Sequence, residues 1–505
     1  MPIHTLENTR ITNTKCCRWV FRIPARNDFY QAPNRPIDSA PTTSIMISRA
    51  ILTLTIASLL SSVAPLIHAG DSSTAKPSAS ALESWFSQDY MLGDWGGLRT
   101  DLADNGVAFE FFFLGSLPSN LSGGIREGSV YQHAMLLALD LDTEKLGAWK
   151  GGRFHASGIW LEGDPFSETY VGDLNKTNLV DFPVAFRLWE VTYEQKLFND
   201  TLLVKAGLMS VDRDFIVPEL YNSLTSINFL NQTFFYPTLA FNLWDIPGFP
   251  AGPHALSSTP YNSAGALVRW QPSDAFYAQA AIYDGYPDVG SSGTRVSLSG
   301  DQGALMYYEL GYRVNQGKDD TGLPGSYKIG GYYHTDEFFD MYDTIASLFG
   351  LTPAPTTHDG NYGGYFLAEQ TLFREQQKND PAKQGLVGFL RFSGAPADRN
   401  LTQFGVDGGL VYKGLFPSRD YDTLGLAVSY LEMSSDLRSA QRAANRVLPG
   451  AFVVADYEGV VELSYKLQLA AWWTLQPSLQ YVIHPGGSKA IADAWVLGAQ
   501  TTLRF

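Results

Sequence analysis

Cysteine is nearly absent from this 505-residue chain, since the two that it has, Cys16 and Cys17, adjoin near its start. They lie within residues 1–45, a stretch with several arginines and no periodic apolar pattern, which we interpret as an extension outside the folded domain. The rest of the chain carries no thiol, so no disulfide framework is expected to hold it.

Long apolar runs are missing as well. No run after residue 69 is long enough for a helical membrane span, which excludes an ordinary helical membrane protein. A shorter run begins at Ala50, follows the basic stretch that Met46 opens, and leads to small residues before Gly70. That arrangement predicts a cleaved secretory signal over 46–69, with Met46 as a candidate initiator.

Positive charge is scarce. Without residues 1–69 the chain keeps 29 Lys+Arg (36 − 7) against 48 Asp+Glu (51 − 3), a net charge near −19. Such acidity excludes binding to nucleic acid through backbone phosphates. The sequence also has no G-x-S-x-G, H-E-x-x-H, C-x-x-C, P-loop or G-x-G-x-x-G motif, so we predict no catalytic residues, no metal and no cofactor.

Period-two alternation is what the chain does have. In one clear case Met135, Leu137, Leu139 and Leu141 alternate with a second face that ends in Asp140. Segments of this kind, each of about 10 residues, predict strands with one face toward lipid and the other toward water. We find sixteen: 107–117, 130–142, 152–162, 185–197, 201–211, 262–272, 275–284, 303–315, 326–336, 362–374, 384–394, 403–415, 422–433, 456–467, 471–483 and 494–505. The predicted fold is all-β, a transmembrane antiparallel barrel of about 16 strands over 107–505.

The links between these strands alternate between short and long, as a barrel requires when turns form one rim and loops the other. We expect the long loops outside the cell and the short turns in the periplasm. Residues 70–92 are expected to be a flexible periplasmic lead-in. Residues 93–106 are expected to hold a short periplasmic helix that Gly106 ends.

The last strand alternates from Trp495 to an aromatic residue, Phe505. This ending resembles the signal by which barrel assembly machinery recognises outer-membrane barrels. In a soluble domain, the same flat apolar edge would promote aggregation. We therefore predict a multi-pass barrel in the Gram-negative outer membrane, in contact with its lipid and lipopolysaccharide.

Four ordered motifs carry a family resemblance: 93–100 (GDWGGLRT), 189–195 (WEVTYEQ), 269–277 (RWQPSDAFY) and 476–487 (QPSLQYVIHPGG). They resemble the carbohydrate-selective porin family, OprB type. The resemblance implies a sixteen-strand barrel that passes sugars, chiefly glucose-like monosaccharides, down their gradient. The family-motif residues are Asp94, Trp95, Gly96, Gly97 and Arg99, with a bracing role at the lower mouth favoured over a plug. Whether the barrel acts alone or as a homotrimer stays open.

Alternation also predicts which charged side chains face the lumen. The candidate pore-lining residues are Glu110, Arg153, Glu190, Glu194, Lys205, Arg269 and Arg313. For any single one, pairing or solvation alone is the commoner role. The long loop 212–261 is too apolar for a linker, and loops of this length are usually functional. We expect it to fold inward and constrict the pore through Asp212, Arg213, Asp214, Asn228, Asn231 and Trp244; an outer lid is the competing interpretation.

Three other functions stay open at this point. An outer-membrane barrel hydrolase needs none of the motifs searched above, and a general diffusion porin would share the fold without a preference for sugars. A soluble exported carbohydrate-binding protein is disfavoured by the lipid-facing apolar faces.

Overall fold

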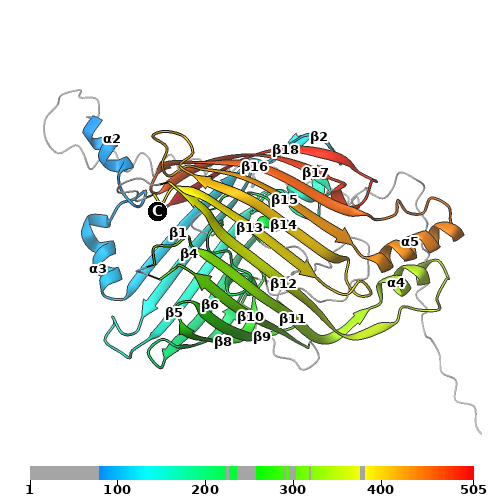
Figure 1. Cartoon of the computed structure of the whole chain (residues 1–505), viewed down its shortest axis with the longest axis horizontal. Coiled ribbons are helices and arrows are strands. Elements are labelled where there is room, and N and C mark those ends of the chain that lie inside the picture. Colours follow the sequence, from blue (N-terminus) through cyan, green and yellow to red (C-terminus); the bar gives the residue numbers. More distant parts are fainter. Residues whose placement is uncertain are drawn as a thin grey trace, which may run out of the picture. The chain divides into compact units, whose positions relative to one another are not determined.

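The computed structural model describes residues 79–222, 227–235, 258–287, 292–294, 303–317, 320–375 and 382–505. The predicted extension 1–45, the predicted signal 46–69 and the first part of the lead-in, 70–78, lie outside these residues, as does Trp244. The strands form a single closed sheet (Figure 1). They are β1 (Val107–Ser116), β2 (Ser119–Gly124), β3 (Gly128–Ser129), β4 (Gln132–Asp142), β5 (Gly152–Glu162), β6 (Ala185–Leu197), β7 (Leu202–Met209), β8 (Ser263–Ser273), β9 (Phe276–Asp284), β10 (Ala304–Val314), β11 (Gly325–Phe339), β12 (Thr357–Arg374), β13 (Gly385–Gly394), β14 (Thr402–Lys413), β15 (Thr423–Met433), β16 (Tyr457–Ala470), β17 (Trp473–Ile483) and β18 (Ala492–Arg504).

Every paired strand in the ring is antiparallel to its neighbour, and β1 closes the ring against β18. The eighteen strand segments make sixteen barrel strands. Strand β18 pairs first with β1 and then with β2, so β1 and β2 are one strand broken at Leu117 and Pro118. Strand β3 likewise pairs with β2 and leads into β4. Subtracting these two continuations from eighteen gives sixteen, which confirms the predicted barrel.

Alternation fixes the two faces of the barrel. In β15, Leu426, Val428 and Tyr430 are exposed on the outer face, while Ala427 and Leu431 are buried on the inner one. Large apolar residues are exposed in this way on most strands, because a lipid-facing side chain needs no protein neighbour. Among the described helices, none is both long and apolar enough to cross a membrane.

Helices lie at both ends of the barrel (Figure 1). At the end with the short turns, α2 (Ala79–Phe86), the 3-10 turn η2 (Trp95–Gly97) and α3 (Leu98–Asp104) precede β1. Within the lead-in predicted as flexible, residues 79–86 are therefore helical, and the Trp85 ring lies 4.6 Å from that of Trp472.

Two helices at the opposite end were not expected. Helix α4 (Met341–Leu348) follows β11, and α5 (Ser435–Val447) follows β15. Each begins at a side chain that caps its free N–H groups: Asp340 accepts from Asp343 N, and Ser434 from the N–H groups of Asp436 and Leu437. Their apolar faces meet in one cluster that includes Ile345, Leu437 and Ala440.

Short helical turns occur in the remaining long connections. They are η3 (Ser167–Val171) between β5 and β6, η4 (Val211–Arg213) and η5 (Gln232–Phe234) between β7 and β8, and η8 (Pro485–Gly487) between β17 and β18. The first three turns lie in segments that enter the barrel, and these segments define the candidate site.

Candidate functional site

Part of the predicted long loop lies inside the barrel. We call residues 210–222 and 227–235 the inserted segment. Its aromatic side chains pack on inward-facing residues of the wall: Phe215 lies 5.3 Å from Tyr307, and the Tyr221 ring stacks on Phe389 at 3.7 Å. Gly425 leaves the space that Phe229 fills, since an added Cβ would lie 2.7 Å from that ring. Residues 210–222 and 227–235 thus pack, through their apolar side chains, on the inner face of the barrel wall.

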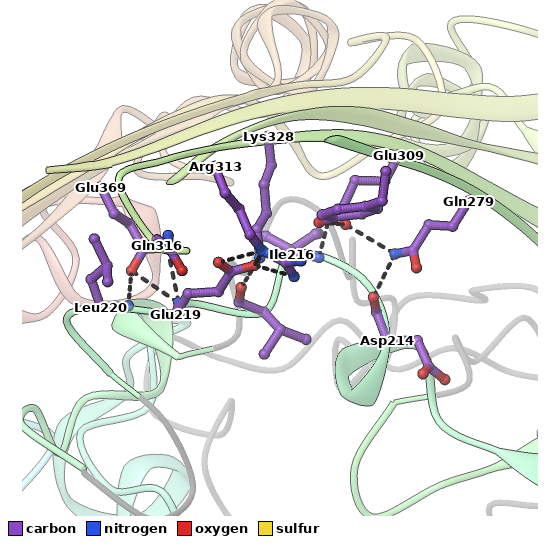
Figure 2. A network of polar contacts seen from close by, with 12 residues as sticks. Asp214, Ile216, Glu219, Leu220, Gln279, Glu309, Arg313, Gln316, Lys328 and Glu369 are labelled. Carbon is purple, nitrogen blue, oxygen red and sulfur yellow. Dashed lines mark hydrogen bonds and ion pairs between the residues drawn. The ribbon is translucent and has the colours of Figure 1, made fainter. Parts of the chain in front are cut away.

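Wall carboxylates hold the main chain of the inserted segment (Figure 2). Glu309 on β10 accepts from Ile216 N at 2.9 Å. Glu369 on β12 accepts from the N–H groups of Glu219 and Leu220 at 2.9 and 2.7 Å, and from that of Tyr221 at 3.2 Å. The segment therefore follows the inner surface of β10 to β12.

A charged cluster joins the same wall to Glu219 (Figure 2). Arg313 Nε lies 3.0 Å from Glu219 Oε2, and Lys328 Nζ lies 2.9 Å from Oε1. Burial alone would raise the pKa of Glu219. The hydrogen bond from Arg313 and the charge of Lys328 outweigh it and lower that pKa to about 2. Arg313 is one residue from the end of β10, and that end lies at the rim of short turns. Its partner Glu219 therefore lies deep in the barrel, near the same rim.

The second half of the segment is bound to β13 through β17. Glu462 accepts from Leu230 N at 2.7 Å and from Asn231 N at 2.9 Å. Arg391, fully buried, pairs with Asp407 at 2.8 Å and donates to the carbonyl oxygen of Thr233. The N–H groups of Leu230 and Asn231 and the carbonyl oxygen of Thr233 are thus met by the wall, as buried polar groups require.

The connection 163–184 enters the lumen beside it. Glu458 on β16 accepts from the N–H groups of Leu174 and Asn175 at 2.8 and 2.7 Å. Asn231 then donates to Asn175 O at 2.9 Å, and Gln232 N donates to Lys176 O at 2.8 Å. The two inserted connections are therefore hydrogen-bonded into one unit.

On the other side of the lumen, β4 to β7 carry a row of paired charges. We call these residues the charged row: Asp140, Arg153, His155, Glu190, Glu194 and Lys205 from the strands, with Arg213 and Asp214 from the inserted segment. Asp140 lies 2.8 Å from both Arg153 and His155. Glu190 lies 3.2 Å from Arg213, and Lys205 lies 2.9 Å from Asp214. The row runs from the rim of short turns, where Arg153 begins β5, to the inserted segment.

The comparisons with known proteins agree with this architecture. Residues 126–505 match the model of the carbohydrate-selective porin, OprB family. The chain belongs to the OprB family. It is 28% identical over 437 residues to Porin B of Pseudomonas aeruginosa, covering 82% of this chain and 91% of that protein. It is 26% identical over 447 residues to the putative porin QuiX of Acinetobacter baylyi, covering 83% and 94%.

A solved member of the family has the same fold. The high-pH structure of Pseudomonas putida OprB aligns with a TM-score of 0.72 at 26% identity, over 83% of this chain and 99% of that one. The predicted family and the predicted location are confirmed: this chain is an outer-membrane porin of a carbohydrate-selective family.

Within this OprB-family barrel, the predicted pore-lining residues fall into two groups. Arg153 and Glu110 are well exposed, with side chains 52% and 44% accessible, and Glu194 and Arg313 are partly so. Glu190 and Lys205 face inward but are buried at the inserted segment, because Arg213 and Asp214 pair with them. Arg269 donates to Gln279 at 2.6 Å and lies over the Tyr277 ring. These inward orientations follow the alternation, whereas the roles assigned to the residues stay predictions.

The predicted constriction residues that the structure describes all lie in the inserted segment. Arg213 and Asp214 join the charged row, but Asp212 turns away from it. Asp212 accepts from Thr259 N at 2.9 Å and is buried. Asn228 donates to Tyr221 O and accepts from Thr423, and Asn231 ties the two inserted connections together. Asp212, Asn228 and Asn231 therefore brace the segment.

Trp189 corrects the alternation in β6. A strict alternation of period two would place Trp189 with Val191 on the outer apolar face. The structure has a β-bulge opposite Ser157 and Gly158, so Trp189 and Glu190 both turn inward. Trp189 is 3% exposed and packs on Ile159 and Leu161.

Sequence reasoning also missed Glu219, Glu369 and Glu458 as functional candidates. Nothing in the local sequence around Glu369 and Glu458 shows that loop N–H groups will meet them. A signal for Glu219 existed, since an acidic residue within an apolar, Pro-containing loop needs a cationic partner if it is buried.

The family motif 94–99 lies before the residues that the OprB model matches. Arg99 Nη1 donates to Phe505 O at 2.7 Å and Nη2 to Phe109 O at 2.9 Å, so one guanidinium bridges β1 and the residue after β18. Asp94 accepts from Thr100 N at 2.9 Å, and Gly96 and Gly97 have φ of 72° and 98°, which favours glycine. Trp95 lies beside Arg99. These contacts support the bracing role predicted for the motif.

Proposed function

We propose that this porin passes small neutral sugars, glucose-like monosaccharides first, by passive diffusion along the charged row. The observation that carries the proposal is the row itself, where acidic and basic side chains alternate. Asp140, Arg153 and Glu194 remain partly accessible, and the row continues through Glu190 and Lys205 to the inserted segment. Paired charges present both donors and acceptors to sugar hydroxyls. They also leave little net field to favour an ion over a neutral solute.

The inserted segment supplies the narrow part of this path. It occupies the lumen against β10 to β17 and brings Arg213 and Asp214 to Glu190 and Lys205. A sugar that exchanges its water shell for the row passes within reach of side chains from both sides. Because the porin holds each solute only through hydrogen bonds and partly solvated groups, binding stays weak enough for release.

Liposome swelling tests this function. Vesicles containing the purified porin are compared in glucose, a disaccharide, a neutral amino acid and a small anion. We expect glucose to enter fastest among solutes of equal size. Equal rates for all solutes of one size would replace this proposal with a general diffusion porin, and hydrolysis of lipid or peptide by the same preparation would favour a barrel hydrolase.

Deletion of residues 225–240 tests the narrowing. We expect a several-fold larger single-channel conductance and loss of the preference for glucose over a disaccharide. Unchanged conductance would contradict the narrowing.

Three partnerships of the barrel belong to the same proposal. The exposed apolar band fits outer-membrane lipid and lipopolysaccharide, and the last strand fits recognition by the assembly machinery through Phe505. A homotrimer is the third, and chemical cross-linking in native membranes, with trimer-sized bands expected, tests it.

A further inference from the structure

Three wall glutamates meet consecutive main-chain N–H groups of an inserted connection. Glu369 accepts from residues 219, 220 and 221, Glu462 from residues 230 and 231, and Glu458 from residues 174 and 175. The exposed fraction of each glutamate is 0%. An inward-facing glutamate of a porin would ordinarily be solvated by the channel water, but here both oxygens of each carboxylate are occupied by a loop.

Main-chain contacts of this kind fix the position of a loop whatever its side chains are. A carboxylate has two oxygens that can accept neighbouring N–H groups together, and hydrogen bonds to a charged acceptor are stronger than neutral ones. The neighbouring N–H groups must converge on a single carboxylate, so the local backbone shape is fixed too. Glu369 and Glu462 hold the two halves of the inserted segment, 210–222 and 227–235, from strands that lie well apart in the ring.

The positions of these contacts matter for the path. From residue 214, whose side chain meets Lys205, to residue 219, whose N–H meets Glu369, the segment runs along the inner wall past Gln279 and Glu309 (Figure 2). Glu462 then holds residues 230 and 231 beside β16, where Asn231 connects to the second inserted connection. Any shift of residues 219–221 or 230–231 away from their wall would move them into the lumen, toward the strand residues of the charged row.

We propose that Glu369 and Glu462 are positioning residues that hold residues 219–221 and 230–231 of the inserted segment against β12 and β16, and so fix the distance of these residues from the strand residues of the charged row. The inference rests on the proposed narrowing of the channel. It assigns the width of the path to two buried acidic side chains that no solute touches.

Two measurements on the full chain separate anchoring from narrowing. Leu230→Cys places a thiol on the segment at a residue that is 1% exposed, without removing its N–H, and Cys16 and Cys17 are first replaced by serine. The rate at which a maleimide reacts with the introduced thiol reports release of the segment. Single-channel conductance and glucose flux report the width of the path.

Glu462→Gln and Glu462→Ala form a graded pair. The glutamine keeps one acceptor oxygen but turns an NH2 group toward a second donor, whereas alanine removes both contacts. We expect the thiol to react at least tenfold faster in Glu462→Gln and faster again in Glu462→Ala, with conductance rising in the same order. Glu369→Gln should likewise raise conductance, which keeps the inference testable if a Glu462 variant does not fold.

Glu162→Gln is the matched control, because Glu162 is exposed at the outer end of β5 and bonds to Trp160. It should change neither rate nor conductance, and heat-dependent mobility in SDS should show a folded barrel in each variant. An unchanged thiol rate in folded Glu462→Ala would overturn the anchoring. Faster reaction with unchanged conductance would support the anchoring and overturn the proposed narrowing instead.

Discussion

Among the inward-facing charges, Asp140, Arg153 and Glu194 on β4 to β6 pair with one another and stay partly accessible, whereas those of β11 to β16 that meet the inserted segment, Lys328, Glu369, Arg391 and Glu462, are buried. Arg153 and Arg391 show the contrast: both face inward on strands, yet the Arg153 side chain is 52% exposed and that of Arg391 is 0% exposed. The period-two pattern that places them is the same. The difference is set by what reaches each side chain from elsewhere in the chain, so identical patterns on one barrel can serve permeation or packing.

Arg391→Met should show the largest effect, because it acts on the buried side of this comparison. Asp407 would keep its charge without its partner, and Thr233 O would lose its donor. Breaking one buried ion pair in this way costs about 3–5 kcal/mol. Urea unfolding of the porin in lipid vesicles, followed by tryptophan fluorescence, measures the loss.

Restoring charge balance is the control. Arg391→Met combined with Asp407→Asn should recover a large part of the lost free energy. A single variant as stable as the parent would show that Asp407 is not held in a dry environment.

Phe389→Ala tests the apolar part of the buried side. Its ring stacks on Tyr221 at 3.7 Å and lies 5.9 Å from Phe229, so alanine would leave a cavity between wall and segment. The expected loss is about 3 kcal/mol in the same unfolding measurement. Leu390→Ala, one residue on and facing lipid, should cost less; equal losses would mean that the segment does not pack on this wall.

Acid should weaken the buried side through Glu219. The pKa of Glu219 is lowered from 4.5 to about 2, so its stabilisation is complete above pH 4.5 and is lost as pH falls toward 2. The full effect is on the order of 3 kcal/mol. The temperature at which half of the porin changes its mobility in SDS, measured from pH 6 to pH 2, should decrease between pH 4.5 and pH 2.

Glu219→Gln provides the comparison for that measurement. It should already be weaker at pH 6 and should show a shallower fall below pH 4.5 than the parent. Parallel profiles would assign the acid sensitivity to other carboxylates.

The sequence predicted the barrel well because alternation is a local property. The face that carries Met135 and Leu137, the sixteen strands and the long connections all follow from residues close together in the chain. The contacts of Glu369 with residues 219–221 join positions about 150 apart in sequence, and no period reveals them. An alternation of period two predicts which way a side chain points, but it does not predict which residues pack against that side chain.

Local detail was missed where a short signal was outweighed by the pattern. The bulge at Trp189 adds one residue to an otherwise regular strand. Arg187 and Glu190 both face inward although they are three positions apart, and this odd spacing of two polar residues is the trace of the bulge in the sequence. Ser434, the N-cap of α5, directly follows the predicted strand 422–433, and no helix was predicted after it. The error at Trp189 came from extending one periodicity past a residue that interrupts it.

Arg153→Gln should show the smallest change in stability and sharpens the comparison from the open side. Its partners Asp140 and Glu194 lie at 2.8 and 3.9 Å, but the pair is solvated, and exposed ion pairs contribute about 1 kcal/mol or less. The loss of one positive charge from the row should instead shift ion selectivity toward cations, seen as a changed reversal potential across a salt gradient in planar bilayers. The same substitution at Arg391 should change stability and not selectivity. The two variants together therefore test whether the wall that carries the charged row and the wall that holds the inserted segment have different functions. A stable Arg153→Gln channel with the parent's reversal potential would place the permeation path away from the charged row.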